Sequence, residues 1–180
     1  MNVLLGVTGG IAAYKSANLA SLLKKEGMEV NVVMTDAATE FVRPLTFETL
    51  SNNPVAVNIF DIKRAWEVEH VSLAQKVDIA VLAPATANTI AKLACGIADN
   101  MLTTVFLALT CPIVVAPAMN TAMLENTATQ VNLQILKDRG FYLMQPGEGK
   151  LACGDEGAGR MPEPEEIAAF IREVLKKKPD

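Results

Sequence analysis

Short apolar runs separated by helical segments are the feature that most constrains the fold of this chain. Five runs are rich in strand-forming residues: 2–8, 29–34, 78–83, 112–116 and 141–144. They are continuous instead of alternating with polar residues, which is typical of strands buried on both faces of a sheet. Strands that alternate with helices build βαβ units. The sequence therefore predicts an α/β fold, a three-layer, doubly wound parallel sheet of the flavodoxin-like or Rossmann-like type.

The segments between these runs have apolar residues at helical spacing. Gly27 and Gly140 follow two of them and are good helix stops. We expect one domain over residues 1–175, with 176–180 as a tail or the start of a linker. The predicted helices cover residues 11–26, 41–52, 88–94, 100–110, 121–139 and 165–177.

Composition and charge exclude several classes of function. The chain carries 16 Lys and Arg against 20 Asp and Glu, a net charge of −4, without a basic face or arm that would suit nucleic acid. It shows neither a membrane-spanning stretch nor a signal pattern, so we expect a cytoplasmic protein. Cys95, Cys111 and Cys153 lack the spacing of a disulfide framework or a metal site, and the first two are expected in the core.

Small and polar residues collect at predicted strand ends, where ligands bind in open parallel sheets. Gly9 and Gly10 let a ligand approach the backbone, and the helix start after them suits a phosphate. A tight turn alone also explains the two glycines, because the full GxGxxG pattern is absent. NAD is a weaker alternative, supported only by Asp36, which stands where a ribose-binding acid would be.

Two similar segments, 81–89 (VLAPATANT) and 114–122 (VVAPAMNTA), run from an apolar strand through Ala-Pro-Ala to an asparagine. The amides of Asn88 and Asn120 can bond a flat heterocycle or a carboxylate, and helix capping is the alternative role. His70 is the only histidine and can carry a proton near neutral pH, although a lone histidine is more often incidental.

The glycine-rich stretch 146–162 carries Cys153 and Arg160. A structureless stretch of this length is usually a lid, a binding loop or disordered. As a flap it would carry Cys153 and Arg160 over a bound substrate. As a disordered connector it would hold only a chance thiol.

Five segments together resemble the homo-oligomeric flavin-containing cysteine decarboxylases over nearly the whole chain, residues 3–164. They are GVTGGIAA (6–13), EHVSL (69–73), PATANT (84–89), PAMNTAML (117–124) and ACGDEGAGRM (152–161). The resemblance implies FMN as cofactor and decarboxylation of 4′-phosphopantothenoylcysteine to 4′-phosphopantetheine in coenzyme A biosynthesis. The implied route is transient oxidation of the thiol to a thioaldehyde, loss of CO₂ and re-reduction. The chain departs from the family at Leu124, where an aromatic residue is common, and at Thr86, where serine is common.

The same resemblance implies roles for individual residues. His70 and Cys153 would be catalytic, with Cys153 supplying a proton to the product, and Asn120 would hold the substrate carboxylate. The expected substrate contacts are Asn120, Met123, Ala152 and Arg160. The expected FMN contacts are Gly9, Gly10, Ile11, Thr35, Thr86, Ala87, Asn88, Thr89 and Met119.

The resemblance also implies an assembly, a homotrimer or a dodecamer of trimers, with each active site between protomers. It leaves open whether a phosphopantothenoylcysteine synthetase domain is fused to the chain or acts as a partner. Two other functions stay open on the same fold: a peptidyl-cysteine decarboxylase and a non-catalytic flavin-binding regulatory subunit. Cys153 favours the coenzyme A enzyme, because the peptidyl-cysteine enzymes lack the reducing half of the reaction and stop at the enethiol.

Overall fold

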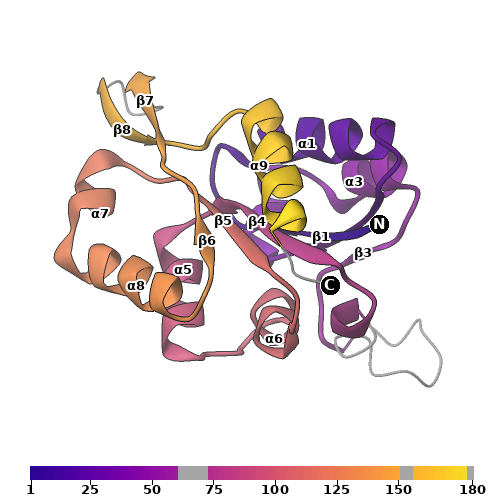
Figure 1. Ribbon diagram of the computed structural model, residues 1–180, viewed down its shortest axis with the longest axis horizontal. Coiled ribbons are helices and arrows are strands. Elements are labelled where there is room, and N and C mark those ends of the chain that lie inside the picture. The colour runs from indigo at the N-terminus through magenta and orange to yellow at the C-terminus, as the bar shows by residue number, and fades with distance from the viewer. Residues whose placement is uncertain (61–72, 151–155, 178–180) are drawn as a thin grey trace.

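A parallel sheet forms the centre of the molecule. The structure, a computed structural model, describes residues 1–60, 73–150 and 156–177. In the described chain six strands pair in the order β3-β2-β1-β4-β5-β6, which confirms the predicted doubly wound α/β fold (Figure 1). They are β1 (Asn2–Val7), β2 (Glu29–Met34), β3 (Val55–Ala56), β4 (Ile79–Ala85), β5 (Ile113–Pro117) and β6 (Tyr142–Leu143).

The strand order has a topological switch point. From β1 the chain runs outward through β2 to β3, and it then returns to β4 on the other side of β1. In doubly wound sheets ligands bind in the crevice at such a point, outside the carboxyl ends of the strands. β1 and β4 therefore end where the sequence collects its small and polar residues.

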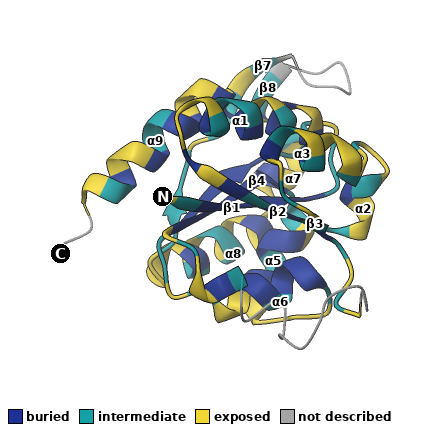
Figure 2. Ribbon diagram, turned by 90° about the vertical axis from the view of Figure 1, so that its right-hand side faces the viewer, coloured by how far each residue is buried: buried dark blue, intermediate teal, exposed yellow. Residues whose placement is uncertain are grey.

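Helices cover both faces of the sheet. Successive strand residues point to opposite faces, so Leu4 packs on one side of β1 while Val3 and Leu5 pack on the other. Figure 2 shows the strands as buried ribbons between helices with exposed outer surfaces. Helices α1 (Ala13–Lys25), α3 (Pro44–Ser51) and α9 (Pro164–Lys176) cover the first face, and α5 (Ala87–Cys95), α6 (Met101–Ala108) and α8 (Thr127–Asp138) cover the second.

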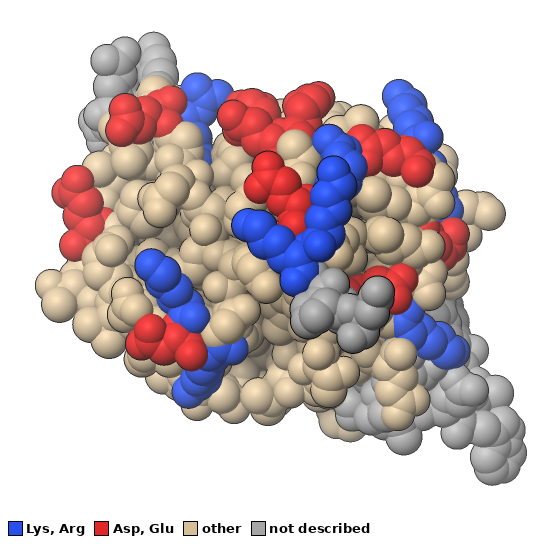
Figure 3. All heavy atoms as spheres, in the orientation of Figure 1, with Lys and Arg blue, Asp and Glu red and all other residues tan. Residues whose placement is uncertain are grey.

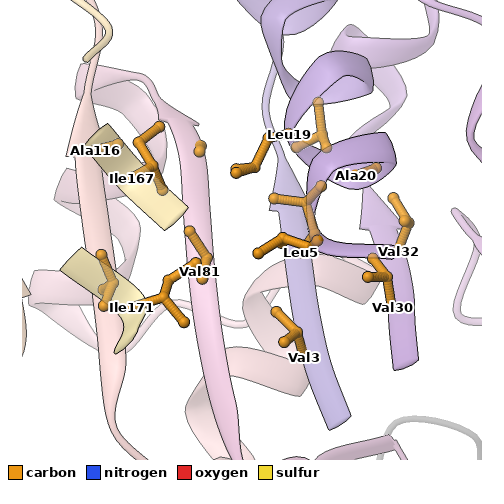
Figure 4. Packing of buried hydrophobic residues seen from close by; sticks show 14 of the residues in the cluster. Val3, Leu5, Leu19, Ala20, Val30, Val32, Val81, Ala116, Ile167 and Ile171 are labelled. Atoms are coloured by element: carbon orange, nitrogen blue, oxygen red, sulfur yellow. The ribbon is translucent and has the colours of Figure 1, made fainter. Parts of the chain in front are cut away.

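Helix α9 packs against the sheet beside α1. Its buried residues Ile167, Ile171 and Val174 recur every three or four positions, which places them on one side of the helix. Figure 4 shows Ile167 and Ile171 in the same layer of side chains as Leu19 of α1. This packing brings the start of α9 next to the start of α1, two segments far apart in the sequence.

On the second face, α6 lies close to β1 because the strand contains a glycine. A Cβ atom at Gly6 would lie 2.7 Å from Cε2 of Phe106. The buried Phe106 ring therefore occupies the space that a side chain at position 6 would need.

Two predicted helices are divided in the structure. The helix expected over 41–52 begins only at Pro44, a residue suited to the first helical turn, and a separate short helix α2 (Asp36–Thr39) precedes it. The helix expected over 121–139 is interrupted at Asn126, whose ψ of 132° separates α7 (Thr121–Glu125) from α8. The Asn126 side chain accepts a hydrogen bond from the Ala128 N–H at 2.9 Å, so it caps α8.

Three short strands were not predicted. β3 pairs with β2 through only two residues, too few to form a recognisable run. Strands β7 (Gly147–Lys150) and β8 (Glu156–Arg160) form an antiparallel hairpin in the stretch that was expected to be structureless. Gly149 and Gly159 have φ angles of +136° and +135°, which residues with side chains rarely adopt in strands. Both strands also lack the apolar pattern by which strands are recognised. The expectation for Cys95 was also wrong, since Cys95 is exposed; Cys111 is partly buried.

The surface agrees with the mixed charge of the sequence. On the face drawn in Figure 3, basic and acidic side chains lie among one another over the described residues. Within the described ranges, every helix is too short or too polar to cross a membrane.

Candidate cofactor and substrate site

The strand ends at the switch point open into a cavity of about 860 Å³. Its walls come from the segments that follow β1, β2, β4 and β5, together with the end of β8. The lining residues are Gly9, Gly10, Ile11, Ala12, Tyr14, Lys15, Thr35, Asp36, Ala37, Thr86, Ala87, Asn88, Thr89, Lys92, Asp99, Asn100, Ala118, Met119, Asn120, Met123, Gly159, Arg160 and Met161.

The turn after β1 is held tightly against its neighbours. A Cβ atom at Gly9 would lie 2.5 Å from the Cβ of Ala37, so only glycine lets this turn approach α2. The buried Thr8 hydroxyl donates to the carbonyl of Pro84 at 2.6 Å and accepts from the Thr86 N–H at 3.1 Å. Thr8 therefore fastens the end of β1 to the end of β4 across the switch point.

Helix α5 begins at the cavity. The Thr86 hydroxyl accepts from the Thr89 N–H at 3.5 Å and caps the helix. Asn88, for which capping was the alternative role, lies instead in the first helical turn and is exposed. A helix N-terminus presents unpaired N–H groups and the positive end of the helix dipole. The start of α5 is therefore suited to bind an anion such as a phosphate.

The segment after β5 displays a polar side chain and two methionines. The Asn120 side chain accepts from the Ala122 N–H at 2.8 Å and caps α7, as its capping interpretation predicted, and Asn120 also lines the cavity. Met119 and Met123 line the same wall, and Met123 is half exposed. This wall combines an amide with apolar surface.

The β7–β8 hairpin is attached to that wall. The Met119 N–H donates to the carbonyl of Gly159 at 2.9 Å, and the Thr121 hydroxyl donates to the carbonyl of Ala158 at 2.8 Å. A side chain at Gly159 would collide with the carbonyl oxygen of Met119. The contact between β8 and the Asn120 loop thus requires glycine at position 159.

Three basic residues line the cavity, each beside an acid. Lys15 Nζ lies 2.6 Å from Oε1 of Glu163, and Arg160 Nη2 lies 3.7 Å from the same oxygen. Lys92 Nζ lies 2.6 Å from Oδ2 of Asp99. The hydrogen bond from Lys92 holds the pKa of Asp99 below its ordinary value.

The structure brings together the predicted site residues that it describes. All nine residues expected at FMN line the cavity, as do the expected substrate residues Asn120, Met123 and Arg160. His70, Ala152 and Cys153 lie outside the described residues. Sequence reasoning missed Lys15 and Lys92 as lining residues. Their signal is spacing, since each lies four residues after a predicted contact, Ile11 or Asn88, and hence one helical turn along the same face.

Metal-ligating side chains do not gather into a site in the part of the chain that the structure describes. None of the Cys, His, Asp and Glu residues there forms a cluster of three or more that could hold a metal ion.

Comparisons with known proteins agree with this architecture. The model of the family described as Flavoprotein matches residues 1–176. The chain belongs to the flavoprotein family. A curated relative from Streptococcus mutans, named as a probable phosphopantothenoylcysteine decarboxylase, is 47% identical to this flavoprotein over 175 residues, covering 96% of this chain and 98% of the relative.

Other relatives are longer. The coenzyme A biosynthesis bifunctional protein CoaBC of Vibrio vulnificus is 46% identical over 177 residues, which are 98% of this chain and 44% of that protein. This flavoprotein thus spans less than half the length of the bifunctional relatives it matches.

Solved structures share the fold over nearly their whole length. A PPC decarboxylase variant complexed with pantothenoylaminoethenethiol superposes with a TM-score of 0.87 at 35% identity, covering 98% of each chain. The FMN-dependent cysteine decarboxylase SpaF superposes with a TM-score of 0.83 at 30% identity, covering 98% of this chain and 96% of that one.

Proposed function

We propose that this flavoprotein binds FMN and decarboxylates 4′-phosphopantothenoylcysteine to 4′-phosphopantetheine in coenzyme A biosynthesis. The observation that carries the proposal is the convergence of the described predicted contacts on one cavity at the switch point of the sheet. Its support from relatives is the 47% identity to a whole-length protein named for this reaction.

The lining residues fit FMN. Gly9 and Gly10 place the turn after β1 in the cavity lining, with Gly9 packed against Ala37, and Ile11 and Met119 offer apolar surface to an isoalloxazine ring. The N-terminus of α5, from Ala87, offers N–H groups to its phosphate. Thr35 and Asp36, at the end of β2, carry oxygens that can bond hydroxyl groups of the ribityl chain.

The cofactor is needed because loss of CO₂ from a cysteine carboxylate leaves an electron pair at Cα that the substrate cannot delocalise. When bound, FMN supplies the reversible two-electron oxidation that converts the thiol into a thioaldehyde, whose C=S group accepts that pair. The protein residues would then bind, orient and transfer protons. In this proposal the Asn120 amide holds the carboxylate, with Met123 and Ala152 also in contact with the substrate.

Two further roles belong to the proposal and concern residues outside the described ranges. His70 would act as the proton-transferring group in the oxidation of the thiol, because an imidazole exchanges protons near neutral pH. Cys153 would protonate the carbon of the enethiol left after CO₂ loss. Both assignments rest on the resemblance of the surrounding sequence to cysteine decarboxylases.

We also propose that the active protein is a homotrimer or a dodecamer of trimers. Supporting this, three large apolar side chains of the cavity lining are exposed: Ile11 to 62%, Tyr14 to 55% and Met123 to 50%. Exposed apolar groups beside a binding site favour contact with a second surface. Light scattering on the purified protein would measure the assembly, and a monomer that is fully active would contradict it.

The bifunctional relatives suggest a further partner. We propose that a phosphopantothenoylcysteine synthetase domain supplies the substrate, either on the same polypeptide or as a separate protein, because the bifunctional CoaBC relative of Vibrio vulnificus matches this chain over only 44% of its length. A cytoplasmic location belongs to the same proposal and would be measured by cell fractionation.

The decisive experiment combines the visible spectrum with product analysis. The purified protein should be yellow or become yellow with FMN, and mass spectrometry should find 4′-phosphopantetheine and CO₂ from 4′-phosphopantothenoylcysteine. A Cys153→Ser variant should release CO₂ and accumulate the oxidised enethiol. Equal turnover of the substrate by protein freed of FMN would refute the proposal. Turnover only of a peptide that ends in cysteine would indicate a peptidyl-cysteine decarboxylase. Retention of FMN without release of CO₂ from either substrate would indicate a regulatory subunit.

A further inference from the structure

Two basic side chains share one wall of the cavity and one acidic partner. Lys15 comes from the first turn of α1, and Arg160 is the last residue of β8. Glu163, the cap residue of α9, accepts from Lys15 at 2.6 Å and lies 3.7 Å from Arg160. Lys15 and Arg160 line the cavity, whereas Glu163, whose side chain is half exposed, pairs with both cations from outside the lining.

Lys15 keeps donors available for a ligand. Lys15 is buried, with 8% of its surface exposed. A buried ammonium group is stable only if its charge and its three N–H groups have partners. The hydrogen bond to Glu163 uses one of these N–H groups. A second anionic acceptor in the cavity would use the others.

Arg160 is oriented from two sides. Its Nη1 would lie 3.0 Å from a Cβ atom at Gly149, so the guanidinium crosses the neighbouring strand where a glycine leaves room. On its other side is Glu163. The Arg160 side chain is 42% exposed and its 3.7 Å contact with Glu163 is an ion pair without a hydrogen bond, so its planar set of N–H donors can bind phosphate oxygens.

The N–H donors of this wall outnumber the acceptors that pair with them. Lys15 and Arg160 share the carboxylate of Glu163. The other described lysine of the lining, Lys92, is paired with Asp99. Asp36, on α2, is the further acid of the lining. An anion with several oxygens would accept from the remaining N–H donors of the Lys15–Arg160 wall.

We propose that Lys15 and Arg160 form a phosphate subsite of the cavity. The choice of a phosphate ester as ligand rests on the proposed function, in which the cofactor and the substrate each carry one phosphate. Both are phosphate monoesters, so the structure names the shared chemistry and an experiment must identify the source. The start of α5 lines the same cavity of about 860 Å³ from a different element, the segment that follows β4.

The test compares ligands that differ only in their phosphate. Flavin-free protein is titrated with FMN and with riboflavin, and holoprotein is assayed with phosphorylated and unphosphorylated pantothenoylcysteine. The variants are Lys15→Gln and Arg160→Gln. The control is Arg172→Gln, which removes an exposed ion pair of α9 with Glu26, 2.7 Å in length, outside the cavity lining.

We expect both variants to lose about 10- to 100-fold of the preference for the phosphorylated ligand in one of the two pairs, the loss that removal of a charged hydrogen bond predicts. A ratio is unaffected by a smaller folded fraction, so partial unfolding would not imitate this result. Loss in the flavin pair identifies the cofactor phosphate as the ligand, and loss in the substrate pair identifies the substrate phosphate. Ratios equal to those of the wild type and of Arg172→Gln in both pairs would overturn the subsite.

A third measurement separates the subsite from the proposed function. Inorganic phosphate at constant ionic strength should raise the Tm of the wild-type protein and of Arg172→Gln more than that of Arg160→Gln. If CO₂ is never released but this difference is found, the subsite stands and the proposed function fails. If CO₂ is released but the difference and both preferences are absent, the function stands and the subsite fails.

Discussion

Residues 81–89 and 114–122 both run from an apolar strand through Ala-Pro-Ala to an asparagine, and the structure places both beside the same cavity. In the first segment Thr86 follows Ala-Pro-Ala and caps α5. In the second segment Met119 stands at the equivalent position. A methionine has no oxygen that can accept from a helix N–H, and the next residue, Asn120, is the cap of α7. The residues after Ala-Pro-Ala therefore decide which residue caps the helix, Thr86 in the first segment and Asn120, one position later, in the second.

The two segments are also anchored differently. Leu82 pairs with Val115 at equivalent positions, but Ala85 pairs with Pro117, so β4 contains one more residue than β5 before its turn. The first turn is fastened to the sheet through the buried hydroxyl of Thr8. The second is fastened to the β7–β8 hairpin. We infer that the first turn is a fixed helix start, whereas the second depends on the position of the hairpin.

The largest expected effect comes from breaking the second anchor at Gly159. Gly159→Ala would place a side chain against the Met119 carbonyl at a φ of +135°, so the hairpin must move away from the Asn120 loop. Strain and overpacking of this kind cost about 2–4 kcal/mol, and displaced site residues lower the decarboxylation rate about 100-fold. Denaturant unfolding and CO₂ release measure the two losses.

The control for this prediction is Gly96→Ala. Gly96 has a positive φ of +71°, and a Cβ atom there would meet nothing within 4 Å, so this variant carries the backbone strain without the collision. Its stability should fall by about 1 kcal/mol, and its CO₂ release should not change. If both variants lost activity equally, the contact between β8 and Met119 would not be the cause.

Breaking the first anchor should have the next largest effect. Thr8→Val keeps the shape of the side chain but leaves the Pro84 carbonyl and the Thr86 N–H without their bonds. The unsatisfied buried groups cost about 2–3 kcal/mol, and FMN affinity should fall because the start of α5 is no longer fixed. Thr49→Val is the control, because the Thr49 hydroxyl donates to the Leu45 carbonyl at 2.8 Å within α3 and neither residue lines the cavity. Equal losses of FMN affinity in the two variants would contradict the anchor.

A smaller effect is expected at Thr121. Thr121→Val removes the hydroxyl that donates to Ala158, a bond at a partly exposed position, so the loss of stability should be about 1 kcal/mol. The asymmetry between the turns predicts a different functional result as well. Thr121→Val should raise the KM for the cysteine substrate and leave FMN affinity unchanged, whereas Thr8→Val should do the reverse. The same pattern in both variants would mean that the two turns act as one unit.

The fold was predictable where its cause is local. Continuous apolar runs and glycine stops give β1, β2, β4, β5 and β6 and most helices, and Gly27 and Gly140 have the positive φ angles of helix ends. The division of 121–139 also had a local cause in Asn126, a capping residue that a count of apolar positions overlooks. The strands β3, β7 and β8 were not predictable, because β3 is stabilised by its pairing with β2 and the hairpin depends on glycine backbone angles.

The candidate site was predictable to the extent that it follows strand ends. Parallel strands place their carboxyl ends together, so Gly9, Thr86 and Asn120 were expected near one another. The wall formed by Lys15 and Arg160 was not predictable, because α1 and β8 lie about 145 positions apart in sequence and meet only through the packing of α9. Residues joined by such packing carry no common motif.

The smallest expected effect concerns the far end of α5, where Lys92 and Asp99 pair. The hydrogen bond from Lys92 keeps the pKa of Asp99 below its ordinary 3.8, so the carboxylate binds its proton less readily in the folded protein than in the unfolded chain. The ion pair therefore stabilises the fold above about pH 4, and this stabilisation is lost as the pH falls through the folded pKa. The Tm of Asp99→Asn should lie below that of the wild type at pH 6, and the gap should close toward pH 3.

Asp138→Asn on α8 is the matched control, because the Asp138 carboxylate accepts from the neutral Gln134 amide at 2.7 Å. A gap that persists unchanged at pH 3 would show that Asp99 acts through its shape and not through its charge.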